Sequence, residues 1–107
     1  VQRAAEAGIA ALAITDHDSV SGLPEAGKSA RARGIAFLNG VELTCGFERI
    51  EVHVVGLGIA PESPHLRQLL DTLAKGRAER LGAILDKLES LGIAVPHENI
   101  TARTADA

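Results

Sequence analysis

The chain has 107 residues and a formal net charge of −3, a length that suits one domain and excludes a second. Phe37 and Phe47 are its two aromatic residues, so this segment alone makes a poor stacking platform for single-stranded nucleic acid, which needs several rings and clustered cations. No segment is apolar enough for a membrane span, and the single Cys45 excludes an internal disulfide. We therefore expect a soluble, cytoplasmic protein.

The first half of the chain has the order of elements that is typical of α/β proteins. The short apolar run of residues 9–15 predicts a buried strand, and residues 22–33 predict a helix with Pro24 in its first turn. Residues 35–42 predict a second buried strand that ends at its glutamate. A strand, a helix and a strand joined by short loops form a βαβ unit, whose two strands are parallel.

A third strand is predicted after a turn at residues 46–49. Residues 51–57 alternate between apolar and polar side chains, which places Glu51 and His53 on one face of that strand. Leucines at helical spacing across residues 64–91 then predict one long amphipathic helix, or two helices that meet at Gly76. We interpret the leucine stripe as a face that packs into a core.

Residues able to hold a metal ion lie at three places along this pattern. Asp16, His17 and Asp18 follow the first strand, Glu42 closes the second, and His53 lies in the third. We expect all three places to lie near the carboxyl ends of the strands, where ligand sites form in parallel α/β proteins. Imidazoles and carboxylates without a thiolate suit zinc, manganese or iron.

Each of these residues also has an interpretation without a metal. The acidic pair around His17 is compatible with a helix cap beside a solvated histidine, and Glu42 with a salt bridge to an arginine. His53 is compatible with a histidine that is hydrogen-bonded within a core. The residues alone leave these alternatives open.

Three blocks of the sequence together resemble the PHP (polymerase and histidinol phosphatase) family of metal-dependent phosphoesterases. They are ALAITDHDSVSGLPEA at residues 11–26, GIAFLNGVEL at residues 34–43 and VHVVGLGI at residues 52–59, in the family's order and with its approximate spacing. The stretch KGRAERLGAILDKLESLGI at residues 75–93 is similar to the helical insertion of the stand-alone branch, which dephosphorylates or trims nucleotides.

The resemblance implies an α/β fold that is part of a distorted barrel of seven β/α units. Residues 1–62 would form the barrel portion, residues 63–92 the helical insertion and residues 93–107 an irregular tail, all within one incomplete domain. The family's first His-x-His strand and its later ligand blocks are absent from this sequence. We therefore expect a fragment that is inactive by itself and, with strand edges uncovered, prone to self-association.

The resemblance also assigns roles within a site of two or three divalent ions, with manganese, zinc or iron as the candidates. It makes His17 a ligand of one metal, Glu42 a bridging carboxylate and His53 a ligand of a second metal. It makes Asp16 and Asp18 catalytic residues that flank His17 and orient its ring through hydrogen bonds. We expect the two imidazoles and the Glu42 carboxylate to converge within about 10 Å, the span of two or three neighbouring ions.

The function implied for the parent protein is hydrolysis of phosphomonoesters or terminal phosphodiesters by a metal-bound hydroxide. Its substrates would be small phosphorylated nucleotides or the ends of short oligonucleotides. A histidinol-phosphate phosphatase and a polymerase-associated domain are alternatives within the family. A non-catalytic α/β module that binds a partner through the leucine stripe is the alternative from another class.

Overall fold

The computed structural model describes residues 1–96 and residue 100. The chain divides into two compact units, Val1–Leu73 and Ala74–Ala107, and every residue that we singled out for chemistry belongs to the first unit. Among the described residues, no helix combines the length and the apolar character that crossing a membrane requires. Most of the tail that we expected to be irregular, residues 93–107, lies outside the described part of the chain.

The predicted βαβ unit is confirmed. The short helix α1 (Gln2–Glu6) precedes strand β1 (Ala11–Ile14), and helix α2 (Leu23–Ala32) connects β1 to strand β2 (Ala36–Phe47). Strands β1 and β2 are parallel and pair from Ala11 opposite Ala36 to Ile14 opposite Asn39. The α/β class predicted from the sequence is therefore correct.

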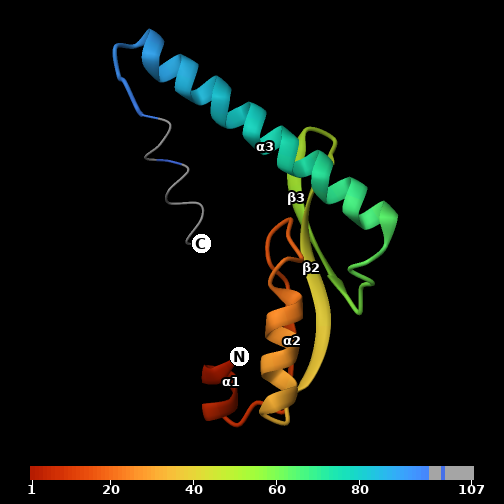
Figure 1. Ribbon diagram of the computed structural model, residues 1–107. Coiled ribbons are helices and arrows are strands. Elements are labelled where there is room, and N and C mark those ends of the chain that lie inside the picture. Colours follow the sequence, from red (N-terminus) through yellow and green to blue (C-terminus); the bar gives the residue numbers. More distant parts are fainter. Residues whose placement is uncertain (97–99, 101–107) are drawn as a thin grey trace. The chain divides into compact units, whose positions relative to one another are not determined.

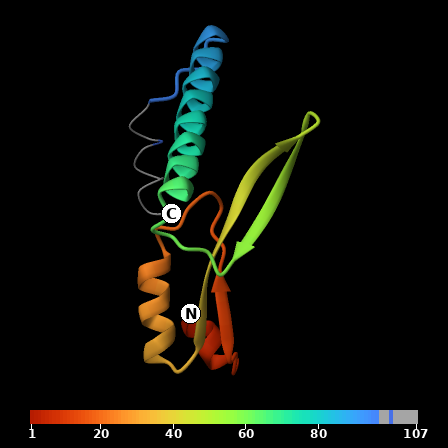
Figure 2. The ribbon, with the colours of Figure 1, turned by 90° about the vertical axis from the view of Figure 1, so that its right-hand side faces the viewer.

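Strand β2 is longer than predicted, because it does not end at Glu42 but continues to Phe47. Its first part pairs with β1, and its second part pairs in antiparallel fashion with β3 (Ile50–Leu57), from Gly40 opposite Leu57 to Phe47 opposite Ile50. Figure 2 shows β2 extending past the end of β1 into this hairpin. Glu42 consequently lies in the middle of a strand.

Helix α2 covers one face of the sheet, and within residues 1–96 the other face, called the open face below, carries exposed side chains. Figure 1 shows α2 alongside β2, and the buried apolar residues of this layer include Leu23, Ala30 and Val41. Side chains alternate along a strand, so Val41 points toward α2 whereas Glu42 points to the opposite face. That open face carries the residues of chemical interest together with exposed apolar side chains such as Val55.

Helix α3 (Pro64–Ser90) is continuous, so the long-helix alternative is correct and Gly76 does not divide it. Proline at its first position is favoured because that residue has no backbone N–H to leave unpaired. Leu85 is buried among the described residues of this helix, whereas Leu69 and Ile84 are largely exposed.

The turn of the β2–β3 hairpin lies within the predicted range of residues 46–49 but is shorter than predicted. Gly46 lies within β2, opposite Glu51, and the loop consists of Glu48 and Arg49, whose φ angles are 49° and 83°. A two-residue hairpin loop favours positive φ at both positions because this conformation matches the twist of the strands. Glycine is the residue that usually supplies it, and this turn has none.

We expect Arg49→Gly to raise the free energy of unfolding by about 0.5–1 kcal/mol, because a left-handed conformation costs a side-chain-bearing residue about 1–2 kcal/mol and glycine much less. Glu51→Gly, a change in the strand beside the turn, should instead lower it. Chemical denaturation of both variants measures the difference. Equal destabilisation by the two changes would show that Arg49 does not hold a left-handed conformation.

Candidate functional site

The loop after β1 is held against the middle of β2 by backbone hydrogen bonds. The amide of Glu42 donates to the carbonyl of Asp16 at 3.1 Å, and the amide of Asp18 donates to the carbonyl of Glu42 at 2.7 Å. These bonds prolong the parallel pairing of β1 and β2 by one bridge, between His17 and Glu42. The loop therefore places His17 next to Glu42.

Strand β3 brings His53 to the same place from the other side. Thr44 lies opposite His53 and Glu42 lies opposite Val55, so Glu42 and His53 are diagonal neighbours on one face of the hairpin. His53 Nδ1 lies 2.7 Å from Glu42 Oε1. The rings of His17 and His53 meet edge to face, with centroids 4.7 Å apart.

The three side chains converge as expected from the sequence. One ligand atom from each of His17, Glu42 and His53 lies within 4.8 Å of the other two. We call these three residues the triad. Glu42 contacts a histidine and not an arginine, and His53 is not buried in a core, although the His17 side chain is as exposed as a solvated histidine.

The expectation that all three places lie at or near the carboxyl ends of strands does not describe Glu42 and His53. Glu42 and His53 lie inside their strands, and β3 runs antiparallel to β2, so these carboxyl ends do not meet at one rim. The residues meet for another reason. Strand β1 is short, and the loop after it continues the pairing with β2 as far as Glu42. Strand β3 pairs with the same part of β2 along its other edge.

The two aspartates beside His17 lie in different surroundings. Asp18 is 6% exposed, and its Oδ2 lies 3.3 Å from His17 Nδ1. Asp16 is exposed, and its carboxylate lies against Gly22, whose added Cβ would be 3.0 Å from Oδ2. Asp16 thus contributes a backbone carbonyl to the pairing with Glu42, whereas the Asp18 carboxylate lies at the His17 ring.

Thr44 is a polar neighbour of the site to which the sequence analysis gave no role. Its amide donates to Asp18 Oδ1 and its hydroxyl donates to Asp18 Oδ2, both at 2.8 Å, and the hydroxyl oxygen also lies 3.3 Å from His17 Nε2. The sequence did contain a signal, because Thr44 follows Glu42 by two residues and so shares its face of a strand. Because the strand was predicted to end at Glu42, Thr44 was not placed on it.

Negative charge around His53 raises the pKa of its imidazole above the ordinary value. The main cause is the hydrogen bond to Glu42, followed by the one to Glu51, whose Oε1 lies 3.4 Å from Nε2, while desolvation acts in the opposite direction. Because the folded-state pKa is raised, the contribution of this contact to stability is present below the ordinary histidine pKa. It is lost as the pH rises through the raised value.

We expect Glu42→Gln to lower the pKa of His53 toward its ordinary value, because the substitution removes the charge that most favours the imidazolium. A proton NMR titration of the His53 ring measures this change in metal-free protein. The matched variant Glu51→Gln removes the weaker contact and should produce a smaller decrease. An unchanged His53 pKa in Glu42→Gln would show that the 2.7 Å contact does not form in solution.

The donor atoms of the triad fit a borderline divalent ion. Two imidazole nitrogens and a carboxylate oxygen without a thiolate are the ligand types that zinc, manganese and iron accept. Ligand atoms around one such ion, each about 2.0–2.2 Å from it, lie roughly 3 Å apart. The separation of 2.7 Å between His53 Nδ1 and Glu42 Oε1 is close to that value, so a small adjustment suffices.

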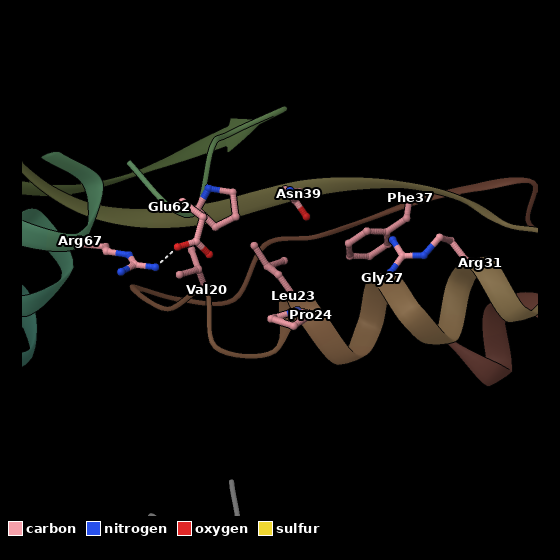
Figure 3. Close-up of a pocket in the computed structure, with 10 residues that line it drawn as sticks. Val20, Leu23, Pro24, Gly27, Arg31, Phe37, Asn39, Glu62 and Arg67 are labelled. Carbon is pink, nitrogen blue, oxygen red and sulfur yellow. Dashed lines mark hydrogen bonds and ion pairs between the residues drawn. The ribbon is translucent and has the colours of Figure 1, made fainter. Parts of the chain in front are cut away.

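A pocket of 250 Å³ lies on the other face of β2 (Figure 3). Phe37, Asn39 and Arg31 line it together with an ion pair between Arg67 and Glu62. Since side chains alternate along β2, Phe37 and Asn39 face away from Glu42. The pocket includes none of the candidate residues predicted from the sequence, and the triad, with its close set of metal-binding atoms, is the candidate site.

Comparison with known families gives one match to most of the chain. The family model described as the PHP domain matches residues 1–93. A solved structure of a candidate metal-dependent phosphoesterase from Bifidobacterium adolescentis is similar in fold, with a TM-score of 0.84 and 25% identity over 95% of this chain and 35% of that one.

The curated relatives of this chain include a bacterial nucleotide phosphatase and bacterial exoribonucleases. The chain is 48% identical to a 3′,5′-nucleoside bisphosphate phosphatase of Chromobacterium violaceum, over 88% of this chain and 33% of the relative. It is 38% identical to a 5′-3′ exoribonuclease of Haemophilus influenzae, over 87% and 34% respectively. The chain thus spans about a third of the length of these relatives.

Proposed function

The chain belongs to the PHP domain family, and we propose that the complete protein containing it is a metal-dependent phosphoesterase acting on nucleotides or on the ends of short oligonucleotides. The observation that carries the proposal is the convergence of the triad within 4.8 Å. The named activities of the relatives, a nucleoside bisphosphate phosphatase and an exoribonuclease, support the substrate class. We also propose that the sheet is part of the family's β/α barrel, with residues 63–92 as a helical insertion.

We propose that the triad holds divalent ions, with His17 on one ion, His53 on a second and Glu42 between them. Bound ions would supply Lewis-acid stabilisation of a phosphoryl group and activation of water, which together remove the need for a serine or cysteine nucleophile. The chain's own residues keep the two imidazoles and the carboxylate on one open face of the sheet. Asp18 lies against His17 and keeps negative charge beside it.

Substrate assays on the complete protein test this function. The protein is stripped with a chelator, reloaded with manganese, zinc or ferrous iron, and given a 3′,5′-nucleoside bisphosphate, a short 5′-phosphorylated RNA or histidinol phosphate. We expect hydrolysis of a nucleotide substrate that disappears with the chelator and returns with one of the metals. Faster turnover of histidinol phosphate would favour the alternative branch. Absence of both metal binding and hydrolysis would favour a non-catalytic module.

The isolated 107-residue chain should show little or no phosphatase activity with added manganese or zinc, because three protein ligands are too few to hold two ions and fix their water. Assay of the purified chain beside the complete protein measures this. Strong turnover by the chain that a chelator abolishes would contradict it.

Self-association of the chain, expected from its uncovered strand edges, has no support from the comparisons and stays a prediction.

A further inference from the structure

Thr44 makes polar contacts beside the triad through both its backbone amide and its hydroxyl. It lies on β2 with its side chain on the face of Glu42, and it gives both of its hydrogen-bond donors to one carboxylate. The amide donates to Asp18 Oδ1 and the hydroxyl donates to Asp18 Oδ2. Each oxygen of Asp18 therefore has a donor from Thr44.

The Asp18 carboxylate needs hydrogen-bond donors because it is buried. It is 6% exposed and has a φ of 49°, a left-handed conformation that aspartate adopts more readily than most residues. A buried carboxylate is tolerated when it is hydrogen-bonded, and the bonds from Thr44 meet that requirement. The loop that carries His17 is thereby fixed to β2 by a side chain as well as by its backbone.

The same hydroxyl reaches His17. A carboxylate accepts hydrogen bonds and has no hydrogen to give, so the single hydroxyl hydrogen of Thr44 is directed to Asp18. The hydroxyl oxygen then presents a lone pair to His17 Nε2 at 3.3 Å. Asp18 Oδ2 lies 3.3 Å from the other ring nitrogen, Nδ1. Thr44 Oγ1 and Asp18 Oδ2, which are hydrogen-bonded to each other, therefore lie together on one side of the imidazole, each near one ring nitrogen.

We propose that Thr44 is a positioning residue of the metal centre, whose hydroxyl fixes the His17 ring beside Glu42 and His53 through its hydrogen bond to Asp18 Oδ2 and its contact with Nε2. This inference rests on the proposed function, because the triad must bind a metal for its geometry to matter. Partners that orient a metal-binding histidine typically change metal affinity by about 10–100-fold when they are removed.

The test uses two variants of the complete protein that differ in the hydroxyl alone. Thr44→Val has nearly the same shape without the hydroxyl, and Thr44→Ser retains it. Cobalt(II) alone is the probe, with affinity from calorimetry and coordination from the visible absorption spectrum. We expect about 10–100-fold weaker binding and an altered spectrum for Thr44→Val, but near-normal values for Thr44→Ser.

Controls separate this inference from the proposed function. Thr72→Val makes the same change in α3, where the hydroxyl donates to the Gln68 carbonyl, and should not alter cobalt binding. If Thr44→Val binds cobalt normally while Glu42→Gln does not, the metal centre stands and the role of Thr44 is wrong. If Glu42→Gln also binds normally, the proposed metal centre itself is wrong.

A second variant keeps the test decisive if Thr44→Val does not fold. Asp18→Asn leaves an acceptor for one donor of Thr44 but places an amide NH₂ against the other, which turns the hydroxyl hydrogen away from Asp18. We expect weaker cobalt binding with retained helical circular dichroism. Unchanged affinity and spectrum in Asp18→Asn would overturn the positioning role.

Discussion

Gly40→Ala should lower the free energy of unfolding by about 3 kcal/mol, at the upper end of the usual cost of overpacking, and the melting temperature by roughly 15 °C. A Cβ at Gly40 would lie 2.6 Å from Thr15 Cγ2, 2.8 Å from the Ile14 carbonyl oxygen and 3.1 Å from the Gly56 carbonyl oxygen. The threonine methyl can turn away. The two carbonyls belong to the strands on either side of β2, so the sheet itself must open.

The same substitution should weaken metal binding, because the end of β1 leads directly into the loop that carries His17. Gly46→Ala is the matched control in the same strand, since an added Cβ there meets nothing within 4 Å. Thermal circular dichroism and cobalt titration of the two variants give the comparison. Equal stability of the two variants would mean that β2 does not approach its neighbours this closely at Gly40.

The βαβ unit was predictable because local signals agreed with the fold. Residues 9–15 and 35–42 are short apolar runs bounded by glycine or polar residues, and Pro24 is at a position that favours the start of a helix. A parallel strand that is covered by a helix has this apolar character. The structure confirms these elements and their parallel pairing.

The second half of β2 was missed because its pattern changes where its environment changes. After Asn39 the ladder with β1 ends and β2 pairs with β3, and side chains on one of its faces are exposed, so apolar Leu43 alternates with polar Glu42 and Thr44. A charged residue at the end of an apolar run resembles a strand end when the run is considered alone. The hairpin turn was predicted two residues too long because Gly46, the one glycine near it, was taken as its start.

The convergence of the three side chains was expected from the sequence, but the strand positions through which they meet were not. Family resemblance selected His17, Glu42 and His53, whereas the residues alone left ordinary structural roles open. Their convergence depends on the register of three strands, which places His53 opposite Thr44 and the loop of His17 beside Glu42. Register depends on contacts between segments far apart in the sequence, so no local pattern reveals it.

Replacing Glu42 with glutamine should reduce the phosphoesterase activity of the complete protein by on the order of 100-fold or more, since removal of even an outer partner of a metal ligand costs about 10–100-fold. The glutamine has the same shape but no charge, and it would stand between two imidazoles within 4.8 Å. A neutral amide cannot balance two divalent ions as a carboxylate does. The loss should appear mainly in kcat and be accompanied by reduced metal content.

Glu51→Gln provides the matched control for this experiment. Glu51 lies on the same strand as His53 and its side chain is 57% exposed, so the same chemical change there removes one weak contact at 3.4 Å. We expect activity within about threefold of the unmodified protein, because exposed ion pairs contribute little. Metal analysis and steady-state kinetics of both variants give the comparison. Equal activity of Glu42→Gln and Glu51→Gln, with full metal content in both, would exclude Glu42 from the reaction and leave the triad as a hydrogen-bonded cluster on the open face of the sheet.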